Sequence, residues 1–375
     1  IECIGKMKVR PYQNLYIHVP FCNGKCAYCA FYSEPEVKQE AVDAWLCRLE
    51  LDAKQYAPQS VPLNTVYLGG GTPTAIPPES LERIFKIIGT YFTLAENAEI
   101  STECNPESLT EEKAAVLGRC VNRVSMGVQS FNPKFRSLIG RRGGGAGTVE
   151  RALDLLRSNG IANIGFDLIY ALPEQTLDDW VRELETSLGY MPRHISAYSL
   201  IIEDGTELAA RDFPPEDNEL SFQMWQTAQD FLGAHGMPRY EISNYAAEKY
   251  ECRHNQNVWH GETYLGLGPG ACSFDGAVRR TEVPSLARWL KGDAAEQDII
   301  EERKRLSEIF IMGLRTVRGW KKSEFSQFSV LSWREMWSKI IEKQISDGML
   351  KESPECISPT EKGLAFWNDL AEAYF

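Results

Sequence analysis

From Leu15 to about Leu200 the chain alternates short apolar runs with stretches of helical periodicity, and this alternation restricts the fold more than any other feature. Six runs have the length and composition of β-strands: Leu15–Val19, Thr65–Leu68, Glu99–Thr102, Arg123–Val128, Ile164–Ile169 and His194–Ser199. The stretches between them predict helices at Val37–Tyr56, Pro78–Tyr91, Glu111–Arg119, Pro133–Ile139, Thr148–Ser158 and Leu177–Leu188. Such alternation is typical of βα units on a parallel sheet.

Six βα units are too few for a closed barrel, which needs eight. We therefore expect an α/β fold with an incomplete (β/α)6 TIM-like barrel, and a doubly wound sheet is the competing architecture. In both architectures, functional groups collect at the carboxyl ends of the strands.

Beyond residue 210 the pattern changes. We expect residues 1–210 to form the partial barrel, 211–300 an extension packed on it, and 301–375 a small winged-helix-like domain. The sequence predicts a helix at Glu219–Ala234, a strand at Tyr240–Ile242 and a glycine-rich loop over residues 264–274. In the last part it predicts helices at Leu306–Leu314, Trp333–Ile345 and Pro359–Tyr374.

Cys22, Cys26 and Cys29 follow the first predicted strand, with three and then two residues between them. Three thiolates on one tight loop can hold three irons of a [4Fe–4S] cluster and leave the fourth iron without a protein ligand. That iron can take an external chelator, such as the amino and carboxylate groups of S-adenosylmethionine (SAM). The alternative is a three-cysteine zinc site completed by His18 or another distant residue, although the chain has no second pair of closely spaced cysteines.

Glycines and aromatic rings accompany the cysteine loop. Gly70, Gly71 and Thr72 end a glycine run after the second strand, where a ligand can approach the backbone because no Cβ intervenes. Tyr16 precedes the cysteines and Tyr28 lies between the second and third of them, so that a ring could stack on an adenine. A simple turn and ordinary strand packing are the structural alternatives.

Four further polar residues stand at or just beyond apolar strands: Glu103, Gln129, Arg141 and Asp167. Buried side chains of this kind need partners. A cationic nucleoside with hydroxyl groups and a carboxylate would satisfy them, because Arg141 suits a carboxylate and the two acids suit ribose hydroxyls or an amino group. A salt-bridge network among the same residues is the alternative.

Composition limits the partners and the compartment. The net charge of −12, without a basic face, argues against nucleic acid as a partner. No segment approaches the roughly 20 apolar residues that cross a bilayer, so we predict no transmembrane segment. Scattered cysteines fit a reducing compartment, and we predict a cytoplasmic protein.

The segments YIHVPFCNGKCAYC, GGGTP, STECNP and GVQSF together resemble the radical SAM superfamily, specifically its oxygen-independent coproporphyrinogen oxidase branch. The resemblance covers nearly the whole chain. It implies a [4Fe–4S] cluster and SAM as cofactors, and the capacity to cleave SAM after an electron donor has reduced the cluster. The marked residues would then contact SAM, with the three cysteines on the cluster.

Within that branch, the dehydrogenases carry a further cysteine where this chain has Phe31, and they have a longer N-terminal extension. The chain is more similar to the heme chaperones of the branch. This similarity implies binding of heme, delivery to an acceptor such as a respiratory enzyme, and peripheral contact with a membrane. It argues against coproporphyrinogen dehydrogenase activity. An anaerobic enzyme acting on a tetrapyrrole, and an electron-transfer module, are the alternatives.

A heme-binding signature of these chaperones, HNxxYW, maps onto His254, Asn255, Val258 and Trp259, with valine in place of the tyrosine. By this resemblance His254 would ligate heme iron and Trp259 would pack on the macrocycle. Cys252 is a second possible ligand. Without the resemblance, a single histidine is more often a structural hydrogen-bonding residue.

Overall fold

The frame of the fold is a row of six parallel strands in the computed structural model, which describes residues 9–211, 213 and 217–375. The first eight residues of the predicted barrel lie outside this range. The strands are β1 (Tyr12–Val19), β2 (Ser60–Gly70), β3 (Leu94–Cys104), β4 (Arg123–Gln129), β5 (Ile164–Tyr170) and β6 (His194–Ser199). Each pairs in parallel with the next, which confirms the six predicted βα units.

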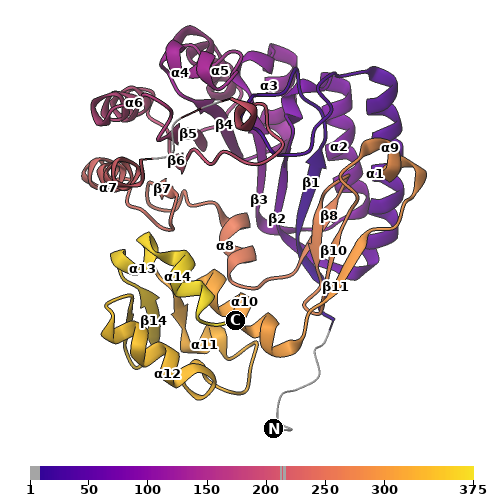
Figure 1. Ribbon diagram of the computed structural model, residues 1–375. Helices are drawn as coiled ribbons and strands as arrows, with labels where there is room; N and C mark the ends of the chain where they lie inside the picture. The colour runs from indigo at the N-terminus through magenta and orange to yellow at the C-terminus, as the bar shows by residue number, and fades with distance from the viewer. Residues whose placement is uncertain (1–8, 212, 214–216) are drawn as a thin grey trace.

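Helices cover the outer face of this sheet (Figure 1). They are α1 (Gln39–Tyr56), α2 (Pro78–Tyr91), α3 (Glu111–Cys120), α4 (Pro133–Leu138), α5 (Ala146–Ser158), α6 (Leu177–Gly189) and α7 (Asn218–Ala234). Local sequence fixes several starts. The Thr110 hydroxyl accepts a hydrogen bond from the backbone of Lys113, and Thr176 forms a capping box with Asp179.

The sheet is open, as predicted. Its order is β11-β10-β9-β8-β1-β2-β3-β4-β5-β6-β7, and the two end strands do not pair with each other. The added strands are β7 (Asn244–Ala246), β8 (Tyr264–Leu267), β9 (Cys272–Phe274), β10 (Val278–Thr281) and β11 (Glu296–Ile299). Because β1 to β6 follow one another in chain order, the architecture is an incomplete barrel; a doubly wound sheet would reverse its strand order.

Two predictions in the extension are wrong. The expected glycine-rich loop over residues 264–274 contains strands β8 and β9, and glycine is needed there because a Cβ on Gly266 would lie 2.2 Å from the carbonyl oxygen of Cys272. The strand expected at Tyr240–Ile242 lies instead at Asn244–Ala246. The Glu241 side chain accepts hydrogen bonds from the Ser243 backbone and the Asn244 amide, which turns the chain before the strand begins.

The C-terminal part has a core of its own, whose buried residues run from Leu306 to Tyr374. Its helices are α10 (Glu302–Gly313), α11 (Lys322–Phe325), α12 (Trp333–Ser346), α13 (Glu361–Ala365) and α14 (Trp367–Glu372). Its antiparallel sheet has the order β12 (Trp320–Lys321), β14 (Cys356–Pro359), β13 (Leu350–Glu352). This is the predicted winged-helix-like arrangement.

The closing helix expected at Pro359–Tyr374 does not form as one element. Pro359 pairs with Leu350 as the last residue of β14, and Thr360 then caps α13. The helix breaks at Phe366, whose backbone leaves the helical range (φ −110°, ψ 40°).

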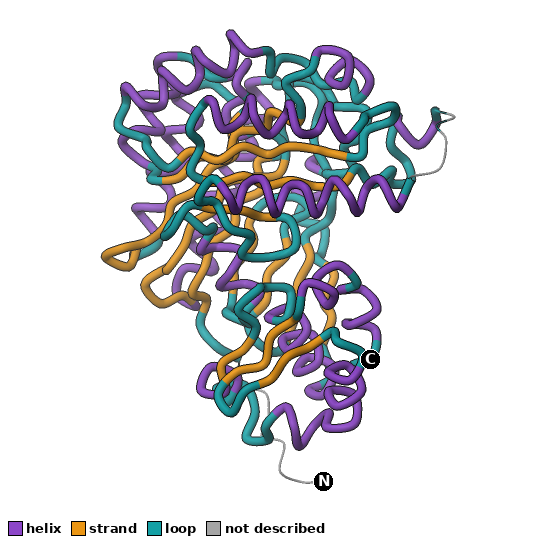
Figure 2. The backbone as a smooth tube through the Cα atoms, turned by 90° about the vertical axis from the view of Figure 1, so that its left-hand side faces the viewer, coloured by secondary structure: helices purple, strands orange, loops and turns teal. Residues whose placement is uncertain are grey.

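Helix α8 (Arg253–Trp259) lies between the barrel and the C-terminal part (Figure 1), and it contacts β2 and α10. Figure 2 shows the C-terminal part, near the mark of the C-terminus, below the barrel. A further helix, α9 (Leu286–Lys291), packs against α1. The Arg315 guanidinium lies 2.7 Å from the carboxylate of the fully buried Glu241 and ties the C-terminal part to the extension. Within the described ranges, none of the helices has both the length and the apolar composition to span a membrane.

Candidate functional site

A cavity of about 540 Å³ opens at the carboxyl ends of β1 to β6 and extends along their inner face. This volume is in the range that binds small organic molecules. Most of the predicted site residues line it: Cys22, Cys26, Cys29, Tyr28, Gly70, Gly71, Thr72, Glu103, Gln129, Arg141 and Asp167. The fold therefore brings together side chains that are spread over about 150 residues of sequence.

The cysteine loop forms one wall of the cavity. Cys22, Cys26 and Cys29 are free thiols and half-buried, and the loop turns at Gly24 (φ +101°) and through a hydrogen bond from the Cys29 amide to the Cys26 carbonyl. In the described part of the chain, no three His, Cys, Asp or Glu side chains are already gathered around one metal position. The fit to a cluster therefore rests on three unpaired thiols of one tight loop that face one cavity.

The alternative zinc ligand, His18, already has partners for its ring. Its Nε2 lies 2.9 Å from the carbonyl oxygen of Tyr32, and its Nδ1 lies 3.2 Å from the hydroxyl of Tyr16. Burial lowers the pKa of His18, so the ring is neutral. With its ring in these contacts, His18 does not line the cavity.

The glycine run lies directly against the segment that leads into the cysteine loop. The Gly71 amide donates to the carbonyl of Val19, and the Thr72 amide donates to that of Phe21. A Cβ on Gly71 would lie 2.6 Å from the Phe21 oxygen, and one on Gly70 (φ +107°) would strike the His18 ring. Glycine is required here for close packing, as well as for access to the backbone.

Two half-buried acids, Glu103 and Asp167, line the cavity. Glu103 accepts hydrogen bonds from the Gly70 amide and the Tyr67 hydroxyl, both at 3.2 Å, and Asp167 accepts from Ser125. Burial, reinforced by the negative charge of Asp167, raises the pKa of Glu103 to about 7. Burial also raises the pKa of Asp167. A cationic ligand between these acids would relieve the cost of their ionisation.

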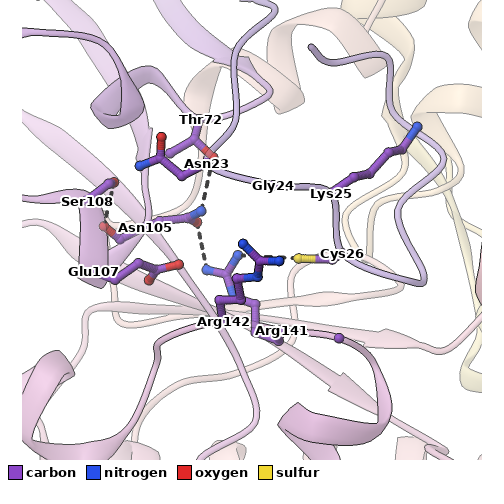
Figure 3. A pocket seen from close by; sticks show the side chains of 11 residues that line it. Asn23, Gly24, Lys25, Cys26, Thr72, Asn105, Glu107, Ser108, Arg141 and Arg142 are labelled. Carbon is purple, nitrogen blue, oxygen red and sulfur yellow. Dashed lines mark hydrogen bonds between the residues drawn. The ribbon is translucent and has the colours of Figure 1, made fainter. Parts of the chain in front are cut away.

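Arg141 connects the cysteine loop to the carboxyl ends of β3 and β4 (Figure 3). Its guanidinium donates to the Asn105 side chain at 2.7 Å and to the Gly127 carbonyl, and lies 3.9 Å from the sulfur of Cys26. The Asn105 amide in turn donates to the Thr72 hydroxyl. Arg141 Nε is buried and has no hydrogen-bond partner, so one donor of this group remains available.

Gln129 is held in an unusual backbone conformation, with φ at +63° at a register shift between β4 and β5. Such a conformation costs about 1 kcal/mol or more and marks functional positions. The side-chain Oε1 is buried without a partner, although the residue lines the cavity. Gln129 therefore offers an unsatisfied acceptor to a ligand.

Three predicted residues do not line the cavity. Tyr16 packs behind it, with its ring stacked on Tyr67 at 6.2 Å. His254 is 6% exposed, and its Nδ1 lies 2.7 Å from the hydroxyl of Thr65. The Trp259 ring packs under the Arg315 guanidinium. The predicted heme contacts of His254 and Trp259 stay predictions.

Several further polar residues line the cavity that were not among the predicted site residues: Tyr67, Asn105, Arg123, Ser125, His194, Ser196, Tyr198 and Asn244. Most follow the period of two along a strand, as in Arg123, Ser125, Gly127 and Gln129 of β4. Because alternate residues of a strand point to the same face, this polar alternation was the signal that could have identified them.

Comparison with known proteins agrees with this geometry. Residues 16–186 match the Radical SAM superfamily and residues 300–366 match the HemN C-terminal domain. In fold, the chain is similar to the coproporphyrinogen III oxidase HemN from Escherichia coli, with a TM-score of 0.83 at 22% identity, covering 98% of this chain and 91% of that one. Fold and site thus define a radical SAM protein of the HemN type, a class whose cofactors are a [4Fe–4S] cluster and SAM.

Full-length relatives specify the family. The chain is 31% identical to the heme chaperone HemW of Lactococcus lactis, covering 96% of both chains. It is 30% identical to the heme chaperone HemW of Escherichia coli, covering 97% of this chain and 98% of that one. The chain belongs to the HemW family.

Proposed function

We propose that this protein is a radical SAM heme chaperone, which binds heme at the mouth of the cavity and passes it to an acceptor protein such as a respiratory enzyme. The main support for the proposal is that one cavity contains both the three-cysteine loop and exposed apolar side chains at its entrance. The sequence similarity to the HemW chaperones also supports the proposal. We also propose that the protein is cytoplasmic. Its further expected partners are an electron donor and, through peripheral contact, a membrane surface.

The cluster and SAM have natural places in the cavity. Cys22, Cys26 and Cys29 would hold the cluster, and Arg141 and Gln129 would orient SAM through their available donor and acceptor. Glu103 and Asp167 would face the positive charge of SAM, Tyr28 would exclude water, and the Gly70–Thr72 backbone would contact SAM. When bound, the cluster supplies the electron that cleaves the sulfonium of SAM.

Apolar side chains gather at the mouth. Phe31 is 71% exposed, Ile201 is 65% exposed and Tyr198 is 41% exposed, and all three line the cavity. Large apolar side chains left in water at a cavity entrance are typical of a binding surface. A flat macrocycle would cover them, and this is where we place heme.

Phe31 also separates the chaperone from the alternative enzyme. By the resemblance of the sequence motifs, Phe31 stands where the dehydrogenases of the branch carry a further cysteine. A phenylalanine at the mouth supplies apolar contact area and no thiol chemistry. We therefore favour heme binding over modification of a tetrapyrrole.

The test is to load the anaerobically prepared protein with heme, SAM and reductant, and then to add a heme-depleted acceptor protein. We expect heme to appear on the acceptor chemically unchanged, as followed by absorbance and chromatography. In parallel, coproporphyrinogen III should be returned unaltered. A new tetrapyrrole product in either reaction would contradict the chaperone function and support an enzyme.

A further inference from the structure

The turn that carries Gln129 is held by a buried carboxylate of a neighbouring helix. Glu183 lies in the middle of α6, is 4% exposed and does not line the cavity. Its two oxygens accept hydrogen bonds from the Ser130 hydroxyl at 2.6 Å, the Phe131 amide at 2.7 Å and the Asn132 amide at 3.0 Å. One carboxylate therefore binds the three residues that directly follow Gln129.

An arginine binds the opposite side of the same turn. Arg136 donates hydrogen bonds from Nη1 to the carbonyl oxygens of Ser130 at 3.2 Å and Phe131 at 2.6 Å. The peptide group between Ser130 and Phe131 thus has a guanidinium on its carbonyl and the Glu183 carboxylate on its amide. Hydrogen bonds with an ionised partner are roughly twice as strong as neutral ones, so this peptide group is firmly fixed.

Gln129 needs such support because its backbone is strained. The Ser130 amide donates to the carbonyl of Val128 at 2.9 Å, which closes a three-residue turn with Gln129 at its centre, where φ is +63°. A turn of this kind with a positive φ at the central residue is rare and strained. Such a conformation persists only where the surrounding structure fixes it, and Glu183 and Arg136 are ionised groups that fix this one.

The backbone conformation decides where the Gln129 side chain lies. A Cβ added to Gly127 would lie 3.1 Å from Gln129 Nε2 and 3.3 Å from Arg141 Nη2, so the two groups are neighbours over this glycine. Both residues line the cavity. A return of φ at Gln129 to its usual negative range would swing the side chain away from Arg141, because the Cβ moves with the backbone.

We propose that Glu183 is a positioning residue, which keeps the Gln129 side chain in place for SAM by binding the backbone that follows it. The inference rests on the contact between Gln129 and SAM that is part of the proposed function. Glu183 lies outside the cavity and acts through the turn. This role also accounts for the serine and phenylalanine of the GVQSF segment, since Ser130 and Phe131 are the residues that Glu183 binds.

The test is a double-mutant cycle of Glu183→Gln and Gln129→Ala, with the SAM affinity of the cluster-loaded full-length protein as the readout. A glutamine at 183 cannot accept all three hydrogen bonds, because its NH₂ group would face an N–H group of the turn. Glu183→Gln should therefore weaken SAM binding by about tenfold when Gln129 is present. In the Gln129→Ala background the same change should weaken SAM binding by less than about twofold.

A matched control separates positioning from general loss of stability. Asp52 is a buried carboxylate of α1, lies 2.8 Å from the Arg48 guanidinium and does not line the cavity. Asp52→Asn should lower the melting temperature, as Glu183→Gln does, and leave SAM affinity within about twofold of wild type. If Glu183→Gln does not fold, Ser130→Ala takes its place in the cycle. This variant removes one of the three hydrogen bonds and should weaken SAM binding by about threefold, only when Gln129 is present.

Two results would overturn the positioning role while the contact of Gln129 with SAM stands. One is a SAM affinity that Gln129→Ala weakens and the change at Glu183 or Ser130 does not. The other is an equal loss from that change in both backgrounds. If Gln129→Ala binds SAM as tightly as wild type, the contact itself fails and the positioning role falls with it. The titrations contain no heme, so failure of heme binding or transfer leaves their outcome readable.

Discussion

The two cavity acids show how burial turns ordinary residues into ligand-binding groups. Glu103 and Asp167 both have a raised pKa because burial disfavours their charged forms, and the negative charge of Asp167 is the second cause at Glu103. In the absence of a cationic ligand, ionisation of Glu103 near neutral pH therefore destabilises the folded protein.

Replacing Glu103 should remove part of the pH dependence of the protein's stability. The pKa of Glu103 rises from 4.5 to about 7 on folding, so the folded state holds the proton more tightly and stability falls as pH rises through this window. The wild type should therefore lose about 2 kcal/mol of unfolding free energy through Glu103 between about pH 5.5 and about pH 8, and Glu103→Gln should not. The unfolding free energy of the variant should thus rise by about 2 kcal/mol relative to that of the wild type over this interval. Urea denaturation of the cofactor-free protein at both pH values measures this gain, and a gain near zero would argue against a raised pKa.

His254 offers a direct contrast between a structural and a ligand role. Burial, with the charge of Arg123 as the second cause, lowers the pKa of His254 to about 3, and its ring bonds to Thr65. We expect His254→Ala to lower the unfolding free energy by about 2 kcal/mol, because a buried ring and its hydrogen bond are lost. If His254 ligates heme iron, as the resemblance predicts, the heme affinity of the folded variant should fall by more than about tenfold, whereas an affinity within about twofold of wild type would support the structural role alone.

At the scale of elements, the end of β2 sets the position of the cysteine loop. Hydrogen bonds from Gly71 and Thr72 join it to Val19 and Phe21, immediately before Cys22. The glycine run and the cysteines thus form one unit, although they are separated in sequence by α1.

A methyl group at Gly71 should disturb this unit. Since its Cβ would lie within 3 Å of backbone atoms of Val19 and Phe21, Gly71→Ala must displace the loop. We expect a loss of about 2 kcal/mol in unfolding free energy and of about tenfold in SAM affinity. Gly89→Ala is the matched control, because this position in α2 has nothing within 4 Å and alanine should stabilise the helix by about 0.5 kcal/mol. Equal SAM affinity of both variants would contradict the close-packing role.

The elements that could be predicted are those with a strong local signal. Apolar runs located β1 to β6, and Thr110 and Thr176 marked helix starts, because periodicity and capping act within a few residues. Strand β8 was missed, since its pairing with β1 joins residues about 250 positions apart and its glycines suggested a loop. The cysteine motif and strand ends identified most of the cavity wall. Arg123 and His194 were missed because they lie at the amino ends of strands.

At the scale of the whole molecule, one sheet unites the barrel and the extension, while the C-terminal part has its own core. The division into 1–210, 211–300 and 301–375 remains our proposal for the domains. It agrees with the buried core residues from Leu306 to Tyr374. Helix α8 and the Arg315–Glu241 ion pair join these parts.

The proposed function depends on an iron that the protein leaves open for SAM, and the EPR spectrum of the anaerobically reconstituted, reduced protein tests this open iron most directly. We predict a [4Fe–4S] signal that changes shape when SAM is added, is lost in Cys26→Ser, and persists in Cys47→Ser, whose thiol is exposed and outside the cavity. A signal that SAM leaves unchanged, or one that Cys26→Ser retains, would contradict the account.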